Sequence, residues 1–474
     1  MEQLLKTTEG TAGGIGAPPA LRKTLRAKDY FTLAFGSMVG VGWMVVIDDW
    51  LGRGGSIGAM AGFLLGGLIL FPIGYVYGHM TERMPDAASE VAYTGAVFSK
   101  AVSFGTGWMM LLAYLIVCPY EAVAIGRIGS YVFPSMNHWE LYKIGGYAVF
   151  LPHVVAGLSL TAVIVGINYR GVKLSATFQN IATFGLLAIF AVFATLGLFK
   201  GDVDNLTPHF SHGAGLKGGL LSVILVLQIV PYFMTGFEAA PKCSEEAAAD
   251  FDPRHYRRMI YLALGAGIFF YVVVIGVVSL IQPWPSLMGH GFATAVAFER
   301  AFKSRLLTQV IMFAVLLSLL KIFNGNFLTA TRLLFAMGRR GLMDERLGSI
   351  ERRYRTPNNS VLFVGAVTML ASFLGQAMLV PISEVGSLAC AIGWMATCAA
   401  FCRGAGGRVS GLPLLVGVIG AVVAASLIVM KLAPEIPGSF DRPDYIALAV
   451  WVLLGLLLWW RRPAAKTVRE TVIE

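Results

Sequence analysis

Long apolar runs alternate with short polar connections along the whole chain. At about 20 residues, such a run can cross the roughly 30 Å hydrocarbon core of a bilayer as a helix. About twelve runs qualify, at residues 28–50, 56–80, 104–133, 151–167, 174–199, 218–240, 258–282, 306–338, 359–378, 381–402, 411–433 and 444–460. The pattern predicts an all-α membrane protein with about twelve transmembrane helices.

The composition agrees with lipid as the surrounding solvent. Hydrophobic residues make up 56% of the 474 residues, charged residues only 14%, and the mean hydropathy is +0.70. A soluble protein carries roughly a quarter charged residues, and a water-exposed surface this apolar would associate. The five cysteines show no CxxC spacing, and His209 and His212 lack a third ligand nearby. We therefore expect no disulfide framework, no metal site and no cofactor.

Positive residues indicate the orientation. Residues 1–27 contain no apolar run, so we expect no cleavable signal peptide but a disordered cytosolic tail, matched by a second tail at 461–474. With both termini inside, the inner segments together with the adjoining ends of the runs hold 26 of the 37 Lys and Arg residues, and the outer loops with theirs hold 9. This bias predicts cytoplasmic termini in a plasma membrane, the inner membrane of a bacterium. It also explains the net charge of +10 without nucleic acid as a partner.

The first run contains a glycine-rich segment at membrane depth. Gly36–Gly42 holds three glycines in seven residues, and each glycine weakens a helix by about 1 kcal/mol relative to alanine. Close packing of a small-residue face against another helix would explain the glycines equally well. On its own, the segment leaves both interpretations open.

The sixth run favours an interrupted helix. It places Pro231, Thr235, Gly236 and Glu238 in the middle of the membrane. Unpaired backbone groups are tolerated in hydrocarbon only beside a polar cavity. Breaks in corresponding helices of two halves point to a transporter's binding site. Free N–H groups at such breaks suit an anion and free carbonyls suit a cation, so a zwitterion fits both.

Four stretches resemble the amino acid–polyamine–organocation (APC) superfamily, above all the amino acid permeases that include the L-type exchangers. The first is Gly36–Gly42, similar to that family's G-x-x-x-G-x-G-I-F signature, with Trp43 where isoleucine is usual. The second combines Gly236–Glu238 with Ser244–Glu246 and Asp252–Pro253. The others are Asn324–Arg332 with Ala336–Gly341 and Thr356–Pro357, and Asn168–Lys173.

The resemblance implies a LeuT-type fold of two inverted five-helix repeats, at 28–199 and 218–402, with two additional helices at 411–460. It implies that a substrate carboxylate sits on backbone N–H groups of the first break and an amino group faces carbonyls of the second. Phe237 would be an aromatic gate. The expected substrate-binding residues are Gly36, Ser37, Met38, Val39, Gly40, Val41, Gly42, Tyr232, Phe233, Met234, Thr235, Gly236, Phe237 and Glu121.

Ionisable side chains within spans are expensive and usually functional. The resemblance makes Glu238 a gating, proton-responsive acid, although a carboxylate that only caps the broken helix is the alternative. Glu121 either lines the cavity or partners Arg127, about two turns further along the same helix. Asp48 and Asp49 form an outer rim that would concentrate cations.

Lys321 and Asn324 are the remaining candidates for coupling and gating. Some proton-coupled relatives carry a lysine in span 5 at the place of a sodium ion; here that place falls on Leu186. Lys321 in span 8 would supply the missing charge from the opposite wall, unless it snorkels to the membrane surface. Asn324 begins the polar segment that follows it.

These features favour a secondary carrier of an amino acid or related small amine, proton-coupled or an exchanger. A polyamine or organocation transporter of the same fold is the alternative. A channel would need a selectivity filter. No P-loop or common hydrolase motif occurs, which argues against ATP-driven transport and against an enzyme.

Overall fold

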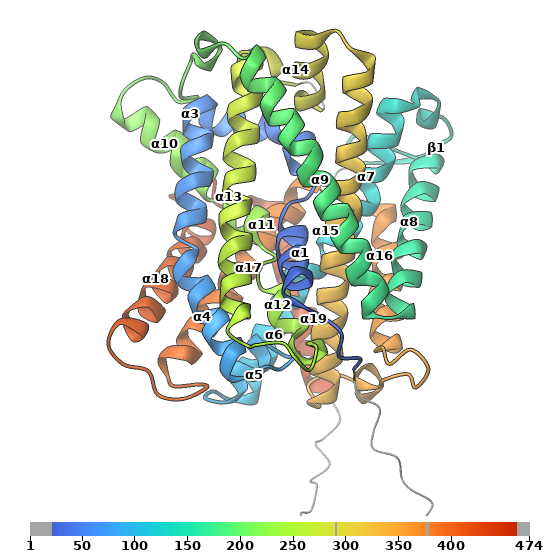
Figure 1. Ribbon diagram of the computed structural model, residues 1–474, viewed down its shortest axis with the longest axis vertical. Coiled ribbons are helices and arrows are strands. Elements are labelled where there is room, and N and C mark those ends of the chain that lie inside the picture. Colours follow the sequence, from blue (N-terminus) through green and yellow to red (C-terminus); the bar gives the residue numbers. More distant parts are fainter. Residues whose placement is uncertain (1–20, 290–291, 376–378, 462–474) are drawn as a thin grey trace, which may run out of the picture.

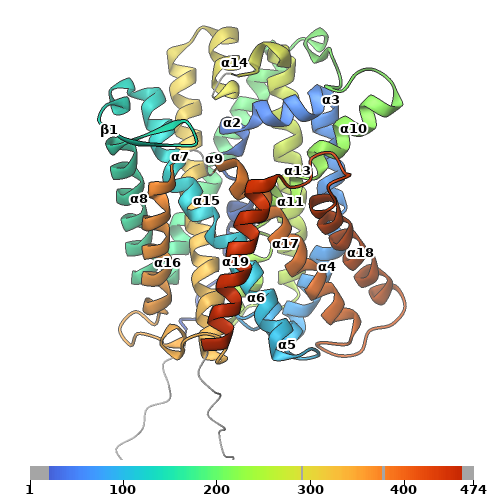
Figure 2. The same cartoon turned by 180° about the vertical axis from the view of Figure 1, so that it is seen from behind.

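The computed structural model describes residues 21–289, 292–375 and 379–461 as a bundle of helices that run mainly along its long axis (Figure 1). Residues 21 and 461 lie at the same end of this bundle, which we call the inner end (Figure 2). The opposite end, the outer end, carries α14 (Ala293–Phe302) and a hairpin of β1 (Glu140–Ile144) and β2 (Tyr147–Phe150).

The other elements follow in chain order. Up to residue 200 they are α1 (Ala27–Met38), α2 (Gly42–Val45), α3 (Ile47–Leu68), α4 (Phe71–Arg83), α5 (Glu90–Gly95), α6 (Lys100–Leu115), α7 (Val117–Val132), η1 (Pro134–Asn137), α8 (Leu151–Arg170) and α9 (Val172–Lys200). Thereafter they are η2 (Val203–Leu206), α10 (Leu216–Leu227), α11 (Val230–Met234), α12 (Ala239–Lys242), η3 (Ser244–Glu246), α13 (His255–Ile281), η4 (Trp284–Leu287), α15 (Arg305–Arg339), η5 (Glu345–Gly348), α16 (Asn358–Ala371), η6 (Ser372–Leu374), α17 (Leu379–Cys402), α18 (Leu412–Leu432) and α19 (Arg442–Arg461).

Within the described residues, nine helical segments are long and apolar enough to cross a membrane. They coincide with nine of the twelve predicted runs. The runs at 28–50 and 218–240 form short helices instead, and the run at 359–378 corresponds to α16 and η6, with residues 376–378 outside the described part. The all-α membrane fold is confirmed, while the total of twelve spans and the inverted repeat stay predictions.

Both predicted helix breaks are present. α1 ends at Met38 and α2 begins at Gly42, with Val39 extended at φ −90° and ψ 100°. α11 ends at Met234, Gly236 has a φ of +129°, and α12 begins at Ala239. Pro231 lies in the first turn of α11, where its missing N–H leaves no hydrogen bond unmade. Local sequence therefore accounts for where these helices stop.

The expectation of a disordered tail up to residue 27 is wrong for residues 21–26. Leu21 and Leu25 are buried, and the Leu25 N–H donates to the Glu246 carbonyl at 2.9 Å. The Ala248 N–H donates in turn to the Leu25 carbonyl at 2.9 Å. Backbone pairing with the end of η3 and the residues after it holds this strand-like stretch against the inner end. The tails at 1–20 and 462–474 lie outside the described residues.

Burial separates an inner set of helices from an outer set. α1, α6, α7, α13 and α15 contribute many of the fully buried side chains, whereas α18 and α19 expose apolar ones such as Val422 and Leu453. Since lipid solvates such an exposed apolar surface, the outer helices can be apolar on both sides. The inner set surrounds the two helix breaks.

Candidate functional site

A small cavity lies where the two helix breaks meet α7 and α15. Its walls are Ser37, Met38, Gly40, Val41, Gly42, Val117, Tyr120, Glu121, Tyr232, Phe233, Thr235 and Ile322. Nine of these twelve are among the residues expected to bind substrate, so the structure brings the two breaks and Glu121 together around one space. Sequence reasoning missed Val117, Tyr120 and Ile322. The helical spacing of Val117, Tyr120 and Glu121 could have identified the first two.

The cavity is almost closed. Its open space is about 10 Å³, enough for about one water molecule. Phe233 closes one side, with its ring centroid 4.7 Å from that of Trp50. At Gly40, an added Cβ would lie 2.4 Å from Ile322 Cδ1 and 3.3 Å from Glu121 Oε1. Larger molecules can enter only if the surrounding helices move apart.

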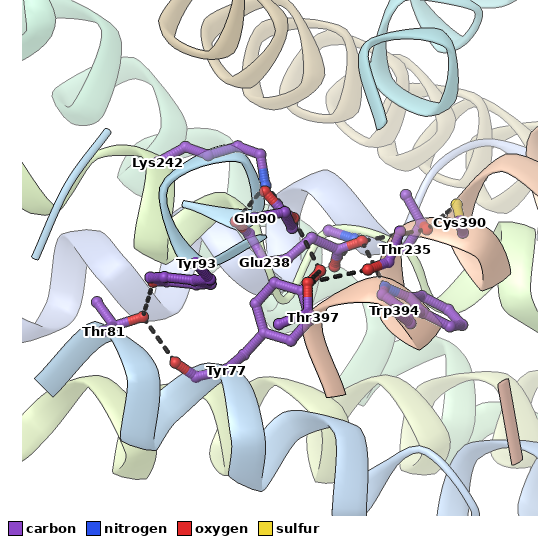
Figure 3. A network of polar contacts seen from close by, with 12 residues as sticks. Tyr77, Thr81, Glu90, Tyr93, Thr235, Glu238, Lys242, Cys390, Trp394 and Thr397 are labelled. Atoms are coloured by element: carbon purple, nitrogen blue, oxygen red, sulfur yellow. Dashed lines mark hydrogen bonds and ion pairs between the residues drawn. The ribbon is translucent and has the colours of Figure 1, made fainter. Parts of the chain in front are cut away.

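Gly236 holds the two breaks in contact. With φ at +129°, a Cβ on this residue would lie 2.6 Å from the Met38 backbone nitrogen. Glycine is the residue that tolerates both this conformation and this approach. The Gly236 N–H donates to the Glu238 carboxylate at 2.9 Å, and Trp394 Nε1 donates to it at 3.1 Å (Figure 3). Glu238 thus satisfies backbone and side-chain donors behind the break; it is fully buried and does not line the cavity.

Phe237 does not lie where a gate over the cavity would be. Its ring centroid is 5.6 Å from that of Tyr77 and 5.6 Å from that of Trp394, and its side chain is fully buried. The chain bends at Gly236, so side chains before and after the bend have different surroundings. Phe233, on α11 before the bend, is the aromatic residue at the cavity wall.

Lys321 joins α15 to the break in the first run. Its Nζ donates to the carbonyl of Gly36 at 3.4 Å and also to that of Val39. Ser318, one turn earlier, donates to the Gly40 carbonyl at 2.7 Å. Lys321 is fully buried, which contradicts the alternative of a snorkelling lysine. Its ammonium occupies the carbonyls that the end of α1 leaves without helical partners.

Glu121 faces the cavity and not Arg127. It is buried, lines the space beside Gly40, and lies close enough to Lys321 to interact electrostatically. The described residues contain no ion pair between Glu121 and Arg127. One helical face therefore presents Glu121 to the break, while Arg127 lies nearer the outer end.

Asn324 lies in a polar network beside the cavity. Its side-chain oxygen accepts from Asn168 at 2.9 Å and Ser175 at 3.1 Å, and its nitrogen donates to Gln179 at 3.0 Å. Gln179 and Thr183 are the α9 side chains nearest Gly36, where a Cβ would meet them at 2.0 and 3.0 Å.

Leu186, where we placed the span 5 lysine of some relatives, has apolar surroundings. Leu186 lines an apolar pocket with Trp43 and Phe190, one turn beyond Thr183. Neither Gln179 nor Thr183 is a lysine, so α9 supplies no cation beside Gly36.

Ion pairs tie the outer rim together. Arg53 contacts Asp49 at 2.9 Å and Glu384 at 3.2 Å, and Lys431 also pairs with Glu384. The Asp49 side chain is half-exposed, in keeping with a solvated rim. Arg53 and Glu384 were not predicted as site residues, because the contact between them and the contact of Glu384 with Lys431 join helices distant in the sequence.

A second network lies on the inner side of the break in the sixth run (Figure 3). Lys242 Nζ donates to Glu90 Oε1 at 2.6 Å and to the Glu238 carbonyl at 3.3 Å. The Tyr77 hydroxyl donates to the same Glu90 oxygen at 2.8 Å. Neighbouring η3 is fixed by Arg332, which donates to both oxygens of Glu246 at 2.9 and 2.8 Å. These buried pairs connect α5, α12, η3 and α15 across the inner end.

Comparisons with known proteins find similarity along most of the chain. The family described as amino acid permease matches residues 25–457. The methylthioribose transporter of Bacillus subtilis (strain 168) is 25% identical, with 93% of this chain and 88% of that protein covered. Amino-acid permease RocE of the same organism is 22% identical over 79% of each chain. The aromatic amino acid transport protein AroP of Escherichia coli (strain K12) is 23% identical over 95% of this chain and 97% of that protein.

Proposed function

The chain belongs to the amino acid permease family, and on that premise we propose that it carries an amino acid or a related small amine by alternating access. Family membership makes it an integral membrane transporter rather than an enzyme. We propose an amino acid as the substrate because RocE and AroP are named as amino acid transporters. The methylthioribose transporter shows that relatives of similar identity are named for other small organic molecules.

The proposal rests on the closed cavity between the two breaks. Residues of both helix breaks lie at its walls, and a helix break can offer backbone N–H groups and carbonyls to the two charges of a zwitterion. Its open space of about 10 Å³ gives no continuous path. A channel would need such a path, lined by a filter. A carrier instead opens the same site alternately to each side.

The cavity wall favours neutral or cationic substrates. Tyr120, Tyr232 and Phe233 supply aromatic surface, and Glu121 is the single acidic residue among the lining residues. A second carboxylate on the substrate would face Glu121 without a matching cation at the wall. The same carboxylate supports a polyamine or organocation as the second candidate substrate.

Lys321 is our candidate for coupling. Its ammonium binds the Gly36 and Val39 carbonyls and so connects α15 to the end of α1. Loss of the proton would remove the charge from these hydrogen bonds and loosen the first run. Glu121 is the acidic group near this ammonium. Transport would then respond to a proton gradient and need no sodium.

The inner end is proposed to be cytoplasmic. Residues 21 and 461 lie there together (Figure 2), and the predicted inner segments carry most of the Lys and Arg residues. This orientation follows the positive-inside rule. Cysteine labelling from each side of intact cells, at Ser349 and at Lys217, measures it directly.

Uptake into proteoliposomes tests the function. We expect saturable uptake of at least one amino acid or amine, stimulated by unlabelled substrate on the opposite side, without sodium and responsive to a pH gradient. Lys321→Ala should bind substrate but lose the pH response. Lys431→Ala, a buried lysine paired with Glu384 near the outer end, is the matched control. Uptake without stimulation from the opposite side would contradict a carrier; sodium dependence or an unchanged pH profile in Lys321→Ala would contradict coupling through this lysine.

A further inference from the structure

A second cavity lies near the outer end, beneath the β1–β2 hairpin. Its volume is about 150 Å³, and it shares no residue with the cavity at the helix breaks. Its walls are Ala122, Val123, Arg127, Ser130, Asn137, Ala148, Val149, Phe150, His153, Val154, Phe292, Ser372 and Gly375. The space holds several water molecules, and pockets for drug-sized ligands are larger. Any occupant is therefore small.

Arg127 places a cation at the wall of this cavity. In the described part of the chain its guanidinium has no ion-pair partner and no side-chain hydrogen bond. It lies 5.7 Å from the ring centroid of Phe292. Asp48 interacts with it electrostatically but forms no ion pair with it. A half-buried arginine without a paired anion is an unfavourable arrangement that an anionic ligand would relieve.

His153 adds a second unsatisfied group. Its Nε2 is shielded from solvent and has no hydrogen-bond partner. The residue lies beside the helix that carries Arg127, since a Cβ on Gly126 would meet His153 Cβ at 2.6 Å. The His153 ring is near enough to Arg127 to interact electrostatically with it. A buried polar atom without a partner calls for an explanation, and a bound ligand is one.

The remaining wall has the character of a binding site for an apolar tail. Ala122, Val149 and Val154 present aliphatic surface, while Asn137 is exposed and offers an amide. Ser130 has its hydroxyl engaged with the Arg127 carbonyl at 2.9 Å. Polar recognition of a buried ligand thus falls mainly to Arg127 and His153.

We infer that this outer cavity binds a small monocarboxylate. The carboxylate would accept hydrogen bonds from the Arg127 guanidinium, which is suited to bidentate contact, and from an Nε2–H of His153. A short aliphatic tail would lie against the hairpin side. α7 also carries Glu121, six residues or about 9 Å before Arg127 along the helix. A bound carboxylate would therefore contact the helix that forms a wall of the central cavity.

Equilibrium binding of radiolabelled propionate to the full-length transporter in detergent tests this site. We expect saturable binding that propylamine does not displace at equal ionic strength. Arg127→Gln and Ala148→Phe should each weaken it at least tenfold, the first by removing the cation and the second by filling the cavity with Arg127 intact. Lys217→Gln, an equal loss of charge at an exposed position near the outer end, should leave it unchanged.

Ile322→Trp separates the two cavities, because it fills the central one alone. Propionate binding that survives in Ile322→Trp supports the outer site, and binding lost there assigns propionate to the central cavity and overturns the inference. The absence of saturable binding to the wild type, or unchanged affinity in either Arg127→Gln or Ala148→Phe, overturns it as well.

Discussion

The buried Glu90–Lys242 pair provides a sharp test of what stabilises the inner end. The two side chains are fully buried and their charged atoms lie 2.6 Å apart, connecting α5 to α12 (Figure 3). Lys242→Met keeps most of the side-chain length and removes the charge. Glu90 then remains buried without its cation, although the Tyr77 hydroxyl still donates to it.

Removing one partner of a buried ion pair destabilises a protein by about 3–5 kcal/mol. Tyr77 retains one hydrogen bond to the carboxylate, so we expect a loss near the lower value, about 3 kcal/mol. The variant also loses the contact of Nζ with the Tyr114 ring, 4.7 Å from its centroid. The double variant Glu90→Gln/Lys242→Met leaves no buried charge and should recover at least half of that loss.

Unfolding of the purified transporter in detergent, followed by tryptophan fluorescence, measures these differences. Lys217→Met is the matched control, because this lysine is exposed and near the opposite end. The single and double variants together form a double-mutant cycle. A loss below about 1 kcal/mol in Lys242→Met, or a double variant as unstable as the sum of both single ones, would refute the reasoning.

Three further outcomes follow from the structure. Gly40→Leu should abolish uptake while expression stays near normal, because the added side chain meets the end of the Ile322 side chain at the cavity wall. Gly236→Leu should abolish uptake and also lower stability, because a Cβ there would lie 2.6 Å from the Met38 backbone nitrogen at a φ of +129°. Normal uptake by both variants would remove the breaks as the site. Burial raises the pKa of the Glu245 carboxyl, but hydrogen bonds from Arg339 and the Ala87 N–H outweigh burial and hold that pKa below its ordinary 4.5. The carboxylate therefore stabilises the fold above pH 4.5, and this stabilisation is lost as the pH falls further. Glu245→Gln should be less stable than wild type by about 1 kcal/mol at pH 7 and nearly equal to it at pH 3. Unfolding midpoints across this range measure the difference between variant and wild type, and a difference that does not change with pH would contradict the prediction. Competition with labelled substrate should favour neutral or basic amino acids, and preferential binding of glutamate or aspartate would show the charge argument to be wrong.

Local sequence determined the membrane-spanning pattern and the positions of the breaks. Run length and hydropathy depend on neighbouring residues alone, and nine predicted runs coincide with apolar helices of sufficient length. The breaks at Gly36–Gly42 and around Gly236 follow from glycine and proline, whose backbone preferences act within a few residues. Both breaks converge on one cavity, and substrate binding at that cavity stays a prediction.

Tertiary structure alone decided which side chains meet. Lys321 contacts a carbonyl 285 positions away and Lys242 a carboxylate 152 positions away, so no periodicity could reveal either partner. The different surroundings of Phe237 and Phe233 have the same origin, because these residues lie four positions apart on either side of the bend at Gly236, which packs against Met38. Apolar length and backbone breaks are properties of short segments. The partner of a buried charge is set by the packing of whole helices, since only an opposite charge or dipole at contact distance offsets its desolvation.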